Sequence, residues 1–311
     1  MSRRRRYLVA CLAGHGIGPE VMAEASRALA EVSRLHGFVV DEAHLPFGRE
    51  AVTRSGHPLP AATRSAYLGA DAILFASSSQ PALASVKEGL DLAASVTQIR
   101  LPAGDVTVFA PLVDEAEDWT IERAFAAARA RSGRLASVSV SRSWLSRVVL
   151  AGTDNDGVEV RHLSLAEALP PLLSGELDVL VTERALAEVL GQLPQLAPSV
   201  RPLVATGLLS TRGPSLFGPT HGSALDIAGQ GVANPSEMLL AAALMLAEGL
   251  GRRSAAETLQ RSVEDALSSG YRTPDMSPAG VAATTREFVD VVLDLMPSAR
   301  RDDEFAIGGV L

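Results

Sequence analysis

The sequence contains very little of several residue types on which enzyme chemistry often depends. Its 311 residues include one cysteine, Cys11, one lysine, Lys87, and only 4% aromatic residues. A single cysteine excludes an internal disulfide and any metal site built from several cysteines. The three tyrosines are Tyr7, Tyr67 and Tyr271. The stretch 88–270 therefore offers neither an ammonium group nor a phenol.

Positive charge and long apolar runs are also scarce. The chain has 28 Lys and Arg against 36 Asp and Glu, a net charge of −8. An acidic chain binds polyanions poorly, so nucleic acid is not an expected partner. The most apolar run, 238–246, is too short to cross a membrane, so no membrane partner is expected either.

The N-terminus predicts a cytoplasmic protein. Arg3–Arg6 and the apolar run 7–13 resemble the start of a secretion signal. However, a glycine-rich turn and an amphipathic helix follow in place of a cleavage site. We therefore interpret 7–13 as a first strand behind a basic tail. The single cysteine fits the same reducing compartment.

Strands and helices alternate along the chain, which predicts an α/β fold with a mostly parallel sheet. The first strand, 7–13, is followed by a turn at 14–18 and a helix from Pro19, which ends near Leu35 before Gly37. Further strands are expected at 38–40, 70–76, 135–140, 158–161 and 177–181. Further helices are expected at 63–68, 121–131, 165–173, 184–192, 236–248, 255–268 and 284–296, with a linker at 195–202.

Three segments together carry a family resemblance. They are Gly14-His-Gly-Ile-Gly-Pro-Glu-Val21, the run from His221 to Pro235 with Phe217-Gly-Pro ahead of it, and Gly270-Tyr-Arg-Thr-Pro-Asp275. In this order and spacing the chain resembles the isopropylmalate/isocitrate dehydrogenase family, the β-decarboxylating dehydrogenases. The resemblance implies a homodimer whose subunits have two domains and a cleft between them. Residues 1–100 and 205–311 would form the large α/β domain, with a nucleotide-binding loop at 217–235, and 101–204 the smaller middle domain.

The resemblance also implies NAD as cofactor. The residues expected to contact it are His221, Gly222, Ser223, Ala224, Asp226 and Asn234. An acidic residue at the place of Asp226 accepts hydrogen bonds from the adenosine ribose and repels a 2′-phosphate, which favours NAD over NADP. The alternative interpretation is a glycine-rich loop that caps a helix, with Asp226 as a turn former.

The chain departs from the family where the chemistry occurs. Members oxidise a 2-hydroxy acid and release CO2, using a divalent cation, a lysine and a tyrosine. The lysine is expected within 138–142, which here is Val-Ser-Val-Ser-Arg. The tyrosine belongs to an arm, but here Pro111–Trp119 leads almost directly into a helix at Ile121, so we predict that the arm is deleted.

The metal ligands and substrate clamp of the family are also altered. Two metal-binding aspartates correspond to Glu188 and Gln192, and a third to Ser164, so neither Mg²⁺ nor another metal is expected. Lys87 and Arg100 stand near the first two substrate-binding arginines, and are predicted to hold one carboxylate or phosphate of a small anionic ligand. The alternative is that both are surface cations. The catalytic residues remain unassigned.

Three hypotheses for function follow. The first is an NAD-binding homologue in which the standard oxidative decarboxylation is absent or strongly impaired. The second is an active NAD-dependent oxidoreductase repurposed for an unusual small carboxylate. The third is a non-catalytic partner or ligand-binding subunit. Whether the chain is an enzyme is left open by the sequence.

Overall fold

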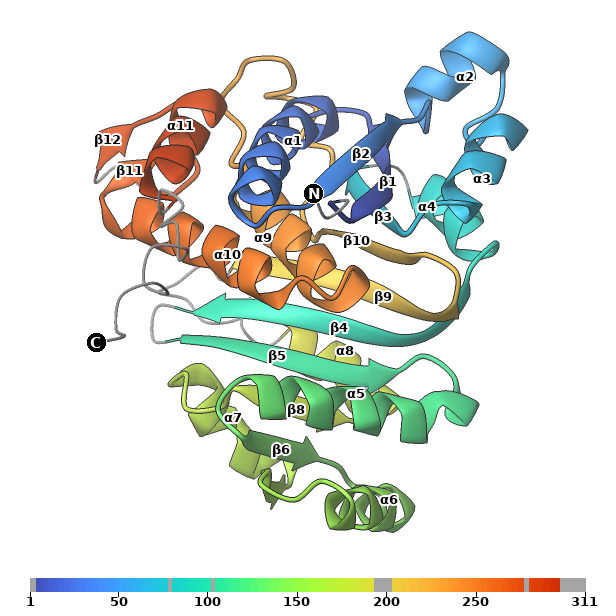
Figure 1. Cartoon of the computed structure of the whole chain (residues 1–311), viewed down its shortest axis with the longest axis vertical. Coiled ribbons are helices and arrows are strands. Elements are labelled where there is room, and N and C mark those ends of the chain that lie inside the picture. Colours follow the sequence, from blue (N-terminus) through green and yellow to red (C-terminus); the bar gives the residue numbers. More distant parts are fainter. Residues whose placement is uncertain (1–3, 78–79, 102–103, 193–202, 277–279, 297–311) are drawn as a thin grey trace, which may run out of the picture.

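A ten-stranded sheet runs through the whole molecule in the computed structural model, which describes residues 4–77, 80–101, 104–192, 203–276 and 280–296 (Figure 1). The strand order is β2-β1-β3-β10-β9-β4-β5-β8-β6-β7. Within the described residues, six of its nine strand pairings are parallel. The strands are β1 Arg6–Gly14, β2 Val39–His44, β3 Ala72–Ser77, β4 Asp91–Leu101, β5 Gly104–Pro111, β6 Arg134–Val138, β7 Glu159–Leu163, β8 Val179–Thr182, β9 Leu203–Arg212 and β10 Ser215–Pro219.

The two halves of the sheet come from different parts of the sequence. Strands from 6–101 and 203–219 form the half from β2 to β4, whereas strands from 104–182 form the half from β5 to β7. The antiparallel pair β4–β5 joins them, in register from Ala94 opposite Pro111 to Leu101 opposite Gly104. The order of the strands agrees with the expected two-part organisation, while the expected domain boundaries stay a prediction.

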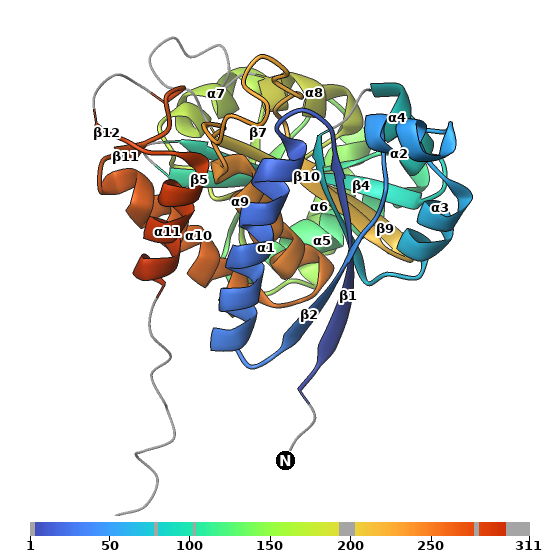
Figure 2. The ribbon, with the colours of Figure 1, turned by 90° about the horizontal axis from the view of Figure 1, so that it is seen from above.

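Helices cover both faces of the sheet (Figures 1 and 2). Apolar side chains of α1, α5, α9, α10 and α11 pack in one core cluster on the first face. On the second face, α3 and α4 cover one half of the sheet, and α7 and α8 cover the other. The helices are α1 Gly18–Leu35, α2 Arg49–Ser55, α3 Ala61–Leu68, α4 Gln80–Lys87, α5 Glu117–Ala130, α6 Arg142–Thr153, α7 Leu165–Leu173, α8 Arg184–Gln192, α9 Ser236–Leu244, α10 Arg253–Ser268 and α11 Thr285–Leu295.

Short elements complete the chain. The 3-10 turn η1, Asp114–Ala116, leads into α5, and the π-helical turn η3, Met245–Gly249, ends α9. A Cβ atom at Gly249 would lie 2.8 Å from the Phe217 ring, so only glycine lets this turn pack against β10. A separate two-stranded sheet pairs β11, Tyr271–Arg272, with β12, Val281–Ala282.

Strand direction reverses in the middle of the sheet. β1, β3 and β10 run parallel, and β9 and β4 connect them in antiparallel steps to β5, β8, β6 and β7. The carboxyl ends of β1, β3 and β10 therefore share one edge, here called the loop edge. The carboxyl ends of β5, β8, β6 and β7 lie at the other edge, here called the opposite edge.

The α/β fold with a mostly parallel sheet is confirmed, and its centre requires a correction. The hydrophobic pattern of the sequence did not predict β4, β5, β9 and β10, and these strands form the antiparallel pairings. These strands are bordered by polar or glycine-containing turns and lack the uninterrupted apolar run of β3, whose six residues are all buried. The expected linker at 195–202 lies outside the described residues. Among the described helices, none is long and apolar enough to cross a membrane.

Candidate functional site at the loop edge

The loop from Thr220 to Pro235 lies where β10 ends, and the three segments that carried the resemblance meet around it. Its neighbours are the turn after β1 with the start of α1, the stretch that follows β11, and the start of α11. Segments more than 200 residues apart in the chain thus contact one another here. Two of the three segments thus contact the third, which is this loop.

The turn after β1 touches the loop backbone directly. The Ile17 N–H donates to the Ser223 carbonyl at 2.9 Å, and the Ser223 hydroxyl lies 3.0 Å from His15 Nε2. Gly16 has φ +67°, and a Cβ atom there would lie 1.9 Å from the Ser223 oxygen. Glycine is required at this position both for its backbone conformation and for the close approach of the two chains.

Glu20, in the first turn of α1, contacts the second half of the loop. Its carboxylate accepts hydrogen bonds from the Gly229 N–H at 3.1 Å and the Ala233 N–H at 3.3 Å. A carboxylate that accepts two backbone N–H groups fixes loop conformation well, because charge-assisted hydrogen bonds are the stronger kind.

Glu237, in the first turn of α9, contacts the first residues of the loop. One oxygen of its carboxylate accepts the N–H groups of Thr220 and His221, both at 3.2 Å. The other oxygen accepts the Val204 N–H of β9 at 3.3 Å. Glu237 therefore ties the beginning of the loop to the central antiparallel strand.

The C-terminal end of the loop is fixed by Asn234 and α11. The Asn234 amide donates to Asp275 at 3.2 Å, and its oxygen accepts the Ser236 N–H at 2.9 Å. Thr285 donates its N–H to the Gly231 carbonyl at 2.8 Å and its hydroxyl to the Ala233 carbonyl at 2.7 Å. Asn234, predicted to face a nucleotide, is thus also a structural residue of the loop.

Other groups of the loop are left available for a ligand. The Asp226 side chain is exposed, and within the described part of the chain its carboxylate has no hydrogen-bond or ion-pair partner. The Nε2 atom of His221 is buried and has no hydrogen-bond partner there either. Gly222, Gly229 and Gly231 have nothing within 4 Å of a Cβ position. These groups fit the adenosine half of a dinucleotide, which needs hydrogen-bonding groups and close approach to backbone.

Ala224 adds a conformational peculiarity to the loop. Its φ of +37° is the only positive value of a non-glycine residue among the described residues. Such a conformation costs of order 1–3 kcal/mol and persists where the surroundings determine it. The anchors at Gly16, Glu20 and Glu237 supply those surroundings.

The structure does not bring Lys87 and Arg100 together. Lys87 ends α4 just before β4, whereas Arg100 lies next to the last residue of that strand. β4 spans 11 residues, so the two side chains start roughly 30 Å apart at about 3.3 Å per residue. Lys87 lies toward the opposite edge and Arg100 toward the loop edge. Whether either cation contacts a substrate stays a prediction.

Arg100 belongs to a network of paired charges on the first face of the sheet. Its guanidinium lies 2.5 Å from Glu264 of α10 and 3.7 Å from Asp105. Asp105 also accepts a hydrogen bond from Arg131 at 2.8 Å. Burial alone would raise the pKa of Asp105, but Arg131 and the Gln98 amide outweigh burial and lower it.

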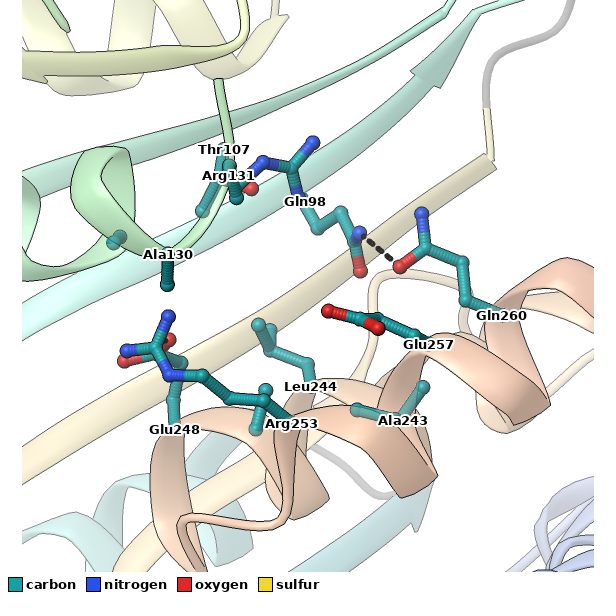
Figure 3. Close-up of a pocket in the computed structure, with 13 residues that line it drawn as sticks. Gln98, Thr107, Ala130, Arg131, Ala243, Leu244, Glu248, Arg253, Glu257 and Gln260 are labelled. Carbon is teal, nitrogen blue, oxygen red and sulfur yellow. Dashed lines mark hydrogen bonds and ion pairs between the residues drawn. The ribbon is translucent and has the colours of Figure 1, made fainter. Parts of the chain in front are cut away.

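In the groove beside this network, several of the lining polar side chains bond to one another, which indicates a structural role (Figure 3). The Gln98 amide of β4 donates to Gln260 of α10 at 3.0 Å, as the close-up shows. Glu248 in the same groove pairs with Arg123 at 2.5 Å. Because these polar groups satisfy one another, the groove joins α5, α10 and the sheet and leaves few groups for a ligand.

The opposite edge has a different character. At the end of β6, Val140 is 76% exposed, and its N–H and the Ser139 hydroxyl donate to Glu183 at 2.7 and 3.1 Å. Ser164 is the N-cap of α7 in a capping box with Glu167. The side chains of Glu188 and Gln192 lie outside the described residues.

No arm is inserted after β5 in the described chain. β5 ends at Pro111, η1 begins at Asp114, and α5 begins at Glu117. Two residues therefore separate the strand from the first turn, which leaves no room for the several tens of residues of an arm.

The sequence alone missed the anchors of the loop. Glu20 stands inside a segment that carries the resemblance, but the sequence pattern predicts no role for it, nor for Glu237 or Thr285. The available signal was their position: each lies in the first turn of a helix, where carboxylates and hydroxyls commonly meet backbone N–H groups. The carboxyl end of β3 also offers a polar group at this edge: Ser77 is buried, and its hydroxyl has no hydrogen-bond partner among the described residues.

Comparison with known proteins identifies the family. The model of the isocitrate/isopropylmalate dehydrogenase family matches residues 8–104 and 116–292. The chain belongs to this family. The match is interrupted between 104 and 116, where most of β5 and the connection to α5 lie.

Named relatives and solved structures agree with this assignment. A 3-isopropylmalate dehydrogenase of Synechococcus sp. (strain CC9605) is 31% identical over 88% of this chain and 95% of its own length. That of Salinibacter ruber is 32% identical over 96% and 98%. The alignment with the Synechococcus enzyme spans 338 positions, more than the 311 residues of this chain, so the relative has residues without counterpart here.

Two crystal structures share the fold. A β-decarboxylating dehydrogenase from Thermococcus kodakarensis superposes with a TM-score of 0.77 at 24% identity, covering 93% of this chain and 96% of the other. An isocitrate dehydrogenase from Methylococcus capsulatus gives 0.74 at 21% identity, covering 93% and 99%. At these identities the likeness establishes the architecture.

Proposed function

We propose that this chain binds NAD through the 220–235 loop and that the standard oxidative decarboxylation of its family is absent or strongly impaired. The 3-isopropylmalate dehydrogenases to which it is similar are oxidoreductases by name. The observation that carries the cofactor proposal is that the loop is anchored from outside, while the Asp226 carboxylate and His221 Nε2 have no hydrogen-bond partner among the described residues.

The cofactor contacts follow from this arrangement. Asp226 would accept hydrogen bonds from the ribose hydroxyls and disfavour a 2′-phosphate by charge repulsion. His221, Gly222, Ser223 and Ala224 would surround the adenine side of the ligand, with Asn234 holding the end of the loop. NAD, when bound, supplies a hydride acceptor.

The impaired chemistry is supported by the opposite edge. Residues 138–142 present Val140 and serine side chains where the resemblance expects a lysine. Arg142 cannot act as a base, because guanidinium stays protonated. General acid–base groups contribute about 10²–10⁴-fold each, so the loss of a lysine and a tyrosine is expected to remove most of the family rate.

A repurposed oxidoreductase or a ligand-binding subunit is the second candidate, with Lys87 as the cation that could hold an anionic ligand. Within the described part of the chain Lys87 has no ion-pair partner, and it lies toward the edge where β5, β8 and β6 end. An unpaired cation there suits a small anionic ligand such as a carboxylate. The resemblance implies a homodimer, which we include in the proposal. If no substrate turns over, the chain would act as a non-catalytic partner subunit.

Calorimetric titration with NAD, NADH and NADP tests the cofactor proposal. NAD or NADH should bind, and NADP should bind more weakly because of Asp226. The absence of binding at millimolar NAD and NADH would contradict the proposal and favour a ligand-binding module that does not use a nicotinamide cofactor.

A further inference from the structure

The edge strand β2 and its neighbour β1 bring together three side chains, Cys11, Glu42 and His44, that take no part in the 220–235 loop. β2 is the edge strand and pairs in parallel with β1, so that Cys11 lies opposite His44 and Val9 opposite Glu42. Glu42 and His44 are two residues apart and therefore point to the same face of the strand. That face packs against α1, whose Ser26 contacts Glu42 (Figure 2).

The distances among the three side chains are close to those of a metal site. Glu42 Oε2 lies 3.0 Å from His44 Nε2 and 3.9 Å from Cys11 Sγ, and all three ligand atoms lie within 4.8 Å of one another. Around a tetrahedral zinc ion, with Zn–N and Zn–O near ~2.1 Å and Zn–S near ~2.3 Å, ligand atoms lie roughly 3.3–3.7 Å apart. Shifts of about 1 Å or less would complete the geometry.

The charges of the cluster also fit a divalent cation. The Glu42 side chain is 16% exposed, and its only ion-pair partner within the described residues is His44. The Glu42 carboxylate is thus largely buried, and a charge removed from water is stabilised by a cation beside it. A divalent ion held by the Glu42 carboxylate, the Cys11 thiolate and the neutral His44 imidazole would give a site of zero net charge.

We propose that Cys11, Glu42 and His44 form a site for a thiophilic divalent transition-metal ion, of which Zn²⁺ is the representative. Sulfur, imidazole and carboxylate ligands select such ions over Mg²⁺ and Ca²⁺, which prefer oxygen ligands only. His44 is 56% exposed and gives the ion access from solvent, whereas Cys11 is buried. Ser26, which donates to Glu42 at 2.5 Å, orients the carboxylate. The ion would fasten the edge strand to β1 beside α1.

Cobalt titration tests the site, because the chain has only one cysteine. Co²⁺ added to the reduced, full-length protein should produce a near-ultraviolet sulfur-to-cobalt charge-transfer band that saturates at one ion per chain. Zn²⁺ should abolish the band and excess Mg²⁺ should not. Cobalt bound at any place away from Cys11 would lack this band, so binding at another site cannot imitate the result.

Variants separate the ligands from bystanders. Cys11→Ser should abolish the band, and His44→Asn, at an exposed position that tolerates change, should weaken cobalt binding at least ~10-fold, since even the loss of an outer partner costs about that much. The control His162→Asn, an exposed histidine on β7, should bind cobalt normally. Failure of wild-type protein to develop the band at millimolar Co²⁺, or a band unchanged by His44→Asn, would overturn the proposal without affecting NAD binding.

Discussion

The loop edge and the opposite edge of the same sheet differ in what their polar side chains bond to. At the loop edge, Glu20, Glu237 and Thr285 all serve one loop from separate helices, and glycine is kept where no larger residue fits. At the opposite edge, the side chains near the ends of β6 and β8 are a hydrocarbon, serines and a glutamate that hydrogen-bond one another. Side chains at one edge thus fix a single loop from several helices, whereas side chains at the other edge bond only to their near neighbours.

The comparison predicts binding without the family's turnover. With NAD, Mg²⁺ and 3-isopropylmalate, isocitrate, malate or tartrate, the rate should fall at least 10²-fold below that of the Synechococcus 3-isopropylmalate dehydrogenase, about the contribution of one acid–base group. Spectrophotometric detection of NADH measures this directly. A rate equal to that of the relative would show that the opposite edge still carries catalysis.

Substitution at Gly16 should lower both NAD affinity and stability, the broadest effect among the single variants. In Gly16→Ala the new methyl group would overlap the Ser223 carbonyl, so the loop must move away, and we expect a loss of at least ~10-fold together with a lower unfolding temperature. The matched control is Gly37→Ala, whose φ of +70° carries the same backbone strain with nothing within 4 Å. Equal effects of the two variants on NAD binding would remove the close contact from the explanation.

Asp226 should control both affinity and cofactor choice. Asp226→Asn removes the charge from the expected ribose contact, and hydrogen bonds to charged groups contribute about 1.5–3 kcal/mol, so NAD binding should weaken on the order of 10–100-fold. The NADP affinity should fall less or rise. Asp156→Asn, at an exposed aspartate between α6 and β7, serves as control. An unchanged NAD dissociation constant would place Asp226 outside the site.

The N-caps of α11 and α7 allow the smallest expected effects at the two edges to be compared. Thr284 caps α11 beside the loop and Ser164 caps α7 in the other half of the sheet, each in a capping box. Thr284→Ala and Ser164→Ala should each cost about 1 kcal/mol of stability by denaturant unfolding. Only Thr284→Ala should also weaken NAD binding, because Thr285 donates to the loop. Equal binding in both variants would mean that α11 does not stabilise the loop.

The sequence predicted the fold best where local pattern and tertiary packing agree. α7 and α8 begin and end where expected, and β3 is as apolar as a strand buried on both faces should be. The antiparallel centre was missed because β4 and β9 alternate small, polar and apolar residues. Their pairing depends on neighbours far along the chain, which periodicity does not report.

The candidate site was predictable in composition but not in geometry. The motif from His221 to Pro235 marked the loop, whereas its anchors depend on contacts between segments more than 200 residues apart. Likewise, Lys87 and Arg100 look close in the sequence, but an extended strand separates them. The cluster of Cys11, Glu42 and His44 was invisible for the same reason, because only the register of β1 and β2 brings it together.

The continuous β4–β5 pairing limits how the two halves of the molecule can move. Eight residue pairs link these strands, and β4 is also paired along most of its length with β9. A hinge at a flexible linker would have to break this ladder. Any relative rotation of the two halves that keeps this ladder would twist the sheet, and we expect the hydrogen-exchange protection of β4 and β9 to persist during it.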